Sequence, residues 1–102
     1  MAESEHALQW LVPASEDLES ILAHLAKERP SAAEALAIRI EDVCALLMQS
    51  PFLGKILPDR LGFSPAYRIL IVEAYVLVYL VEDEVVLIHR LLHGARNYRE
   101  FL

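Results

Sequence analysis

The strongest constraint on the fold is a series of apolar runs in the second half of the chain. Residues 67–72, 75–81 and 85–92 are rich in valine, isoleucine, leucine and tyrosine, and only short stretches separate them. Residues of these types favour strands, and short gaps join neighbouring strands in antiparallel hairpins. The sequence therefore predicts two consecutive hairpins, with turns at residues 73–74 and 82–84.

The predicted strands also indicate what must cover the sheet. Residues 69–72 and 76–78 do not alternate between apolar and polar types, so both faces of the sheet are predicted to be apolar. Two amphipathic helices can cover only one face. The other face, or a groove beside it, is either a docking surface for another chain or is covered by the C-terminal tail or the loop at 51–66.

The first half of the chain predicts a short strand followed by a helix. Residues 7–12 are mostly apolar and end at Pro13, which suits a short strand. Ser15 is the expected N-cap of the helix, because its side chain can accept a hydrogen bond from an unpaired backbone N–H group. One helix face is formed by apolar residues at helical spacing, namely Leu18, Ile21, Leu22 and Leu25.

A second helix is predicted after a break at residues 27–30. Ser31 and Glu34 match a capping box, in which each side chain satisfies a backbone N–H group of the first turn. The helix runs to about Gln49, and so short a break predicts an antiparallel helical hairpin. Its apolar stripe consists of Leu36, Ile40, Val43 and Leu47.

Together these elements predict an α+β fold, with a helical hairpin packed on one face of an antiparallel sheet. A length of 102 residues suits one domain covering residues 1–102, and we expect residues 1–6 to be a flexible N-terminal extension. Residues 51–66 contain several prolines and glycines. They predict a loop with one short edge strand near residues 55–57.

Composition excludes several classes of protein. The single cysteine, Cys44, excludes an intrachain disulfide and a multi-cysteine metal site, and we expect neither a metal nor a cofactor. The acidic N-terminus differs from a signal peptide, and the nearly apolar run at 69–81 is too short to span a bilayer. We therefore expect a cytoplasmic protein without membrane contact. Its net charge of −6 opposes non-specific binding to nucleic acid.

Basic residues nevertheless gather in two stretches of the second half, where a local patch would bind an anion. The alternative is that these side chains lie on solvated faces. The residues concerned are Lys55, Arg60 and Arg68 in the first stretch, and Arg90, Arg96 and Arg99 in the second.

The end of the last predicted strand carries the residues most suited to chemistry. Gly94 interrupts the strand, and His93, Arg96 and Tyr98 follow one another within six residues. Arg68 begins a strand of the same sheet. Arginines suit a phosphate, and His or Tyr can move a proton, so the four side chains would form an RNA-cleaving site if they converged.

Five segments occur in an order that resembles a known family. They are residues 13–21, 35–47, 50–55, 67–71 and 86–96, and the most specific is the last, which ends in His93-Gly94-Ala95-Arg96. The family is that of the RelE/ParE toxins of bacterial type II toxin–antitoxin systems, also known as plasmid stabilisation systems. The resemblance covers roughly residues 8–102.

The resemblance implies a toxin that a cognate antitoxin wraps and neutralises. In this family the antitoxin makes the DNA contacts, so the toxin would touch operator DNA only indirectly. The resemblance also implies the small α+β fold predicted above. Whether the free chain forms a homodimer stays open.

The two branches of the family imply different targets. RelE-like toxins cleave messenger RNA on the ribosome, and Arg68 and Arg96 match their catalytic arginines, with His93 and Tyr98 as further candidates. ParE-like toxins inhibit DNA gyrase and are not known as nucleases. The acidic charge and the ending at residues 93–96 favour the ParE-like branch, and thus a protein that is not an enzyme.

In the ParE-like interpretation, a separate set of basic residues would bind the target or an anion. The RelE-like messenger endoribonuclease is the alternative, and a degenerate family member that acts only as a binding module is a further alternative. The basic residues assigned to target or anion binding are Lys55, Arg60, Arg90 and Arg99.

Overall fold

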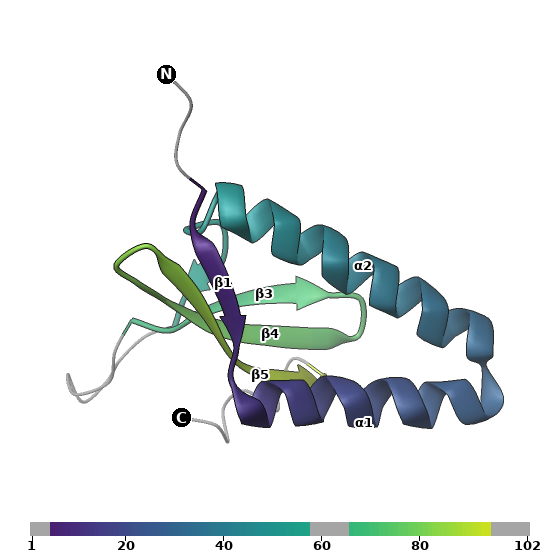
Figure 1. The fold of residues 1–102 in the computed structure, drawn as a ribbon. Helices are drawn as coiled ribbons and strands as arrows, with labels where there is room; N and C mark the ends of the chain where they lie inside the picture. Colours follow the sequence, from purple (N-terminus) through teal and green to yellow (C-terminus); the bar gives the residue numbers. More distant parts are fainter. Residues whose placement is uncertain (1–4, 58–65, 95–102) are drawn as a thin grey trace.

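The computed structural model describes residues 5–57 and 66–94, and shows two helices packed on one face of a five-stranded sheet (Figure 1). The predicted α+β fold class is confirmed. No helix in the described part of the chain is long and apolar enough to cross a membrane. The elements are β1 (Ala7–Trp10), α1 (Val12–Glu28), α2 (Pro30–Gln49), β2 (Lys55–Ile56), β3 (Arg68–Val72), β4 (Tyr75–Glu82) and β5 (Val85–His93).

The sheet has the strand order β1-β5-β4-β3-β2. The last three strands form the two predicted antiparallel hairpins, with turns at residues 73–74 and 83–84. Glu73 and Asp83 have positive φ angles of 58° and 54°, as the tight turns of hairpins require. β1 pairs in parallel with β5, so the sheet is mixed.

Both helices have a proline as their first or second residue, and neither has the predicted serine cap. α1 begins at Val12 and has Pro13 in its first turn, so the prediction of Ser15 as the N-cap is wrong. α2 begins at Pro30 without a side-chain cap, so the capping box predicted at Ser31 is also wrong. Proline lacks an N–H group and has a helical φ angle. It therefore suits the first helical position, whose N–H group has no partner within the helix.

A single residue, Arg29, separates the two helices. They run in opposite directions and diverge from this junction (Figure 1). The predicted helical hairpin is therefore confirmed. The predicted stripe of α2 is buried against the sheet. Full burial of a large apolar side chain contributes roughly 1.5–3 kcal/mol. The strand residues of the same core are Val72, Tyr75, Leu77, Tyr79, Val86, Ile88 and Leu91.

The opposite face of the sheet was expected to be either a docking surface or a covered one, and along β4 it is buried. On β4, Val76, Val78 and Leu80 alternate with the core residues, and their exposed fractions are only 1%, 0% and 6%. The centre of this face is therefore closed in the folded chain. The exposed apolar side chain on the neighbouring strand β3 is Ile71, at 61%.

Candidate functional site

The described part of the predicted catalytic group does not converge. Arg68 lies opposite Tyr79 on β4, and His93 lies opposite Tyr75, four residues along the same strand. Four residues of a strand span about 13 Å. His93 contacts the Tyr75 ring, with 5.2 Å between the ring centroids. The structure thus places His93 beside the first residue of β4 and Arg68 beside its middle.

Arg68 is held against the loop that precedes β2. Its Nη1 donates to the carbonyl oxygen of Gly54 at 2.8 Å and to that of Phe52 at 3.2 Å. Its guanidinium carbon lies 4.9 Å from the centre of the Phe52 ring, within the range of a cation–π interaction. Arg68 therefore fixes the shape of this loop in the free protein.

Gly54 is the residue of this loop that the fold requires. Its backbone N–H donates to the hydroxyl of Tyr79, at 2.7 Å, and Tyr79 is fully buried. A Cβ atom at position 54 would lie 2.6 Å from that hydroxyl and 2.7 Å from the carbonyl oxygen of Ile69, closer than van der Waals contact permits. Burial raises the pKa of the Tyr79 hydroxyl, and the bond from Gly54 and the charge of Arg68 offset part of the shift.

The loop presents apolar side chains to solvent. Phe52, Leu53 and Ile56 are exposed by 61%, 49% and 51%, and the exposed Lys55 lies among them. We call Phe52, Leu53, Lys55 and Ile56, together with Arg68, the β2 patch. Two of the predicted site residues, Lys55 and Arg68, thus lie at the same edge of the sheet, although the strand register directs them to opposite faces.

Arg90 has a different position. Its guanidinium forms two hydrogen bonds with the carboxylate of Asp17 on α1, at 2.7 and 2.9 Å. The same carboxylate accepts the backbone N–H of Leu91, at 2.9 Å. The bond to Asp17 raises the pKa of Arg90. Arg90 therefore joins α1 to β5, and nothing in the sequence around Asp17 indicated this partner.

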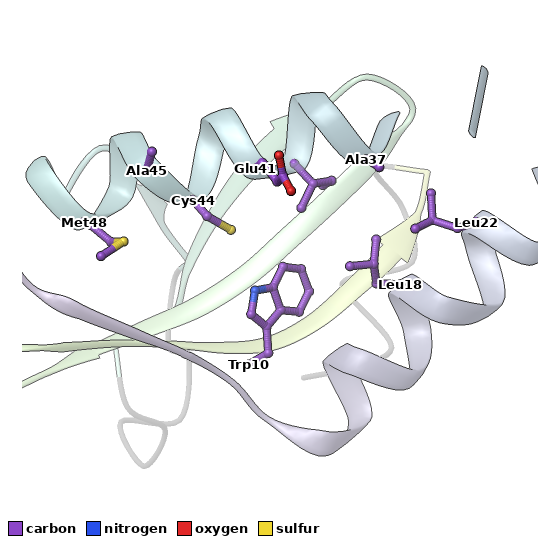
Figure 2. A pocket seen from close by; sticks show the side chains of 9 residues that line it. Trp10, Leu18, Leu22, Ala37, Glu41, Cys44, Ala45 and Met48 are labelled. Carbon is purple, nitrogen blue, oxygen red and sulfur yellow. The ribbon is translucent and has the colours of Figure 1, made fainter. Parts of the chain in front are cut away.

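A groove of about 470 Å³ opens between the two helices, and Trp10 of β1 lies at its base (Figure 2). Burial raises the pKa of the Cys44 thiol in its wall, while a hydrogen bond with Trp10 opposes the shift. Glu41 is the charged residue of the lining. We call this the hairpin groove. Its lining residues are Trp10, Leu18, Leu22, Ala37, Ile40, Glu41, Cys44, Ala45 and Met48.

The remaining predicted site residues, Arg60, Arg96, Tyr98 and Arg99, lie outside the described residues, as do residues 1–4 of the predicted extension. His6, at the end of that extension, donates its N–H to the carbonyl of Met48 at 2.8 Å. The sequence had suggested neither the hairpin groove nor the role of Tyr79.

Solved structures with the same arrangement come from toxin–antitoxin systems. The chromosomal ParDE system of P. aeruginosa contains a chain with a TM-score of 0.72 and 22% identity, and the match covers 90% of this chain and 99% of that one. The RelBE2 toxin–antitoxin complex of Mycobacterium tuberculosis gives 0.60 and 24%, over 87% and 98%. The fold is thus one that occurs in chains of such systems.

The sequence identifies the family within this class. The sequence model described as the ParE toxin of the type II toxin–antitoxin system parDE matches residues 8–98. The chain therefore belongs to the ParE toxin family. A search of curated proteins found no match.

Proposed function

We propose that this protein is a ParE-like toxin that acts in the cytoplasm, inhibits DNA gyrase and is neutralised by a cognate antitoxin. The observation that carries the proposal is the family match, which spans residues 8–98. The arrangement of Arg68 supports gyrase over messenger RNA as the target. This arginine contacts loop carbonyls and an aromatic ring and lies far from His93 along β4.

The hairpin groove is the surface that we assign to the antitoxin. It is lined almost entirely by apolar side chains, and its charged residue, Glu41, is exposed. A groove of this kind binds the apolar face of an amphipathic helix. Residues 1–50 also carry a net charge of −6, which favours an antitoxin segment with lysine or arginine beside its apolar face.

The target is tested with gyrase and with translating ribosomes in parallel. We expect the purified protein to inhibit gyrase supercoiling and to leave ribosome-bound messenger intact. Messenger cleavage without an effect on gyrase would overturn the gyrase assignment and favour the RelE-like alternative.

The antitoxin assignment is tested with the product of the neighbouring gene. Ala45→Arg places a long, positively charged side chain at the exposed rim of the groove, and we expect it to weaken antitoxin binding by at least about tenfold. Ala35→Arg, at an exposed position of α2 outside the groove lining, is the matched control and should bind normally. Equal binding by both variants would exclude the groove as the docking site.

A further inference from the structure

Exposed apolar side chains are concentrated at one edge of the sheet. Three of those in the described part of the chain lie within five residues at the start of β2, and a fourth, Ile71, lies on the adjacent strand. The strand register places Ile56 on one face of the sheet and Ile71 on the other, so these side chains gather around the edge of the sheet. Exposed apolar side chains that gather in one region mark an interaction site more often than scattered ones do. The exposed large apolar residues are Val12, Ile38, Leu46, Phe52, Leu53, Ile56 and Ile71.

The β2 patch is held in one shape before any partner binds. The Gly54 N–H is bonded to the buried Tyr79 hydroxyl, and the Gly54 carbonyl to Arg68. The Phe52 carbonyl and ring also contact Arg68. A surface fixed in this way loses little conformational entropy on binding, and aromatic and arginine side chains are enriched among the residues that dominate binding energy.

The charge of the patch is opposite to that of the hairpin groove. Residues 50–57 and 68–72 contain two bases, Lys55 and Arg68, and no acid. The groove instead has the acidic residue Glu41 in its lining. Trp10, at the floor of the groove, lies on β1, the strand at the opposite edge of the sheet from β2. The two surfaces therefore suit partners of opposite charge.

We propose that the β2 patch is the surface that binds the target of the toxin. It fits a protein segment that presents apolar side chains flanked by carboxylates. The inference rests on the proposed function, because it takes this chain to be a toxin with a protein target. It assigns target and antitoxin to different surfaces, and it makes Arg68 a positioning residue of the patch.

The experiment compares Phe52→Ser and Lys55→Glu with two controls in the full-length protein. Ile38→Ser removes an exposed apolar side chain from α2, and Lys27→Glu reverses an exposed charge on α1. Growth arrest on induced expression reports toxicity whatever the target is. Gyrase supercoiling, antitoxin binding and thermal melting are measured on the same purified variants.

We expect each patch variant to need at least about tenfold more protein for half-inhibition of gyrase and to lose growth arrest. Antitoxin affinity and melting temperature should stay at the wild-type values, because Phe52 and Lys55 are exposed and lie outside the groove lining. Both controls should remain toxic.

Two results would overturn the assignment of the patch. One is full toxicity of both patch variants, and the other is a parallel loss of antitoxin binding, which would make the patch part of the antitoxin interface. A wild-type protein that arrests growth without inhibiting gyrase would instead overturn the proposed target, and the growth assay would still decide the role of the patch. A wild-type protein without either effect would overturn both.

Discussion

The two edges of the sheet differ in what covers them. At one edge β1 pairs with β5 for four residues, and beyond it α1 continues along β5, where Asp17 binds Arg90 and the backbone N–H of Leu91. At the other edge β2 pairs with only two residues of β3, Arg68 and Ile69. Gly54 lies immediately before β2, in the loop that leads to this edge.

This difference separates an edge that the chain covers with its own helix from an edge that it leaves exposed. An acidic side chain from α1 replaces a neighbouring strand at the β5 edge, so that edge offers little to another molecule. The β3 edge keeps Ile71 exposed, with the β2 patch beside it. An edge strand with exposed apolar residues attracts partners, and a charged residue such as Lys55 limits non-specific pairing there.

The largest effect is expected at the open edge, from Gly54→Ala. The new Cβ atom would meet a buried hydroxyl and a backbone oxygen, neither of which can move freely. We expect a loss of about 2–3 kcal/mol in the free energy of unfolding, measured by urea denaturation. Gly94→Ala is the comparison. Its surroundings are open and only its φ angle of +80° opposes a side chain, so we expect a smaller loss of about 1 kcal/mol.

An equal or smaller loss for Gly54→Ala than for Gly94→Ala would contradict this account of the loop. It would mean that the segment before β2 relaxes without cost. The β2 patch would then not be fixed before it binds.

The closed edge is tested by Asp17→Asn. The amide keeps the size of the side chain but removes the charge that attracts Arg90, and it leaves only one acceptor oxygen for three donor bonds. Since Asp17 and Arg90 are partly exposed, we expect a loss of about 1–2 kcal/mol in the free energy of unfolding. Glu16→Gln, at an exposed position next in the chain, is the control and should change stability by less than about 0.5 kcal/mol. Equal stability of the two variants would show that Asp17 does not close this edge.

The smallest effect concerns His89, the extra residue of a β-bulge in β5. Burial lowers its pKa below the ordinary value of 6.5 in the folded protein, and Glu82 offsets part of the shift. As the pH falls through about 6.5, the unfolded chain binds a proton that the folded chain does not, so stability decreases. We expect His89→Gln to reduce this decrease, relative to the wild-type protein, in urea denaturation between pH 8 and about 5.5. A steeper dependence in His89→Gln would reverse the assigned sign.

Local patterns predicted most of the elements correctly. The apolar runs gave β3, β4 and β5 to within a residue or two, and the stripe of α2 is buried as its spacing indicated. The helix starts were wrong. Serine, which can cap a helix, and proline, which can begin one, occur close together in both segments, and the sequence alone does not rank them.

The candidate site was predicted less well, because its contacts join distant parts of the chain. Arg68 was selected for its guanidinium, yet its partners lie 14 and 16 residues away in a loop. Arg90 was expected to bind a target, and its partner is 73 residues away on α1. Residue type indicates what a side chain can bind, but not which group will be within reach.

The amino-acid sequence by itself determined the strand runs, the hairpin turns, the apolar stripe of α2 and the order of segments that resembles the toxin family. These features depend on residues that are close together in the chain, so the spacing of apolar and turn-forming residues indicates them directly. Only the tertiary structure decided the parallel pairing of β1, the closure of one sheet edge by Asp17, the fixed β2 patch and the hairpin groove. Each of these depends on packing that brings distant segments together, and that packing is a property of the whole core.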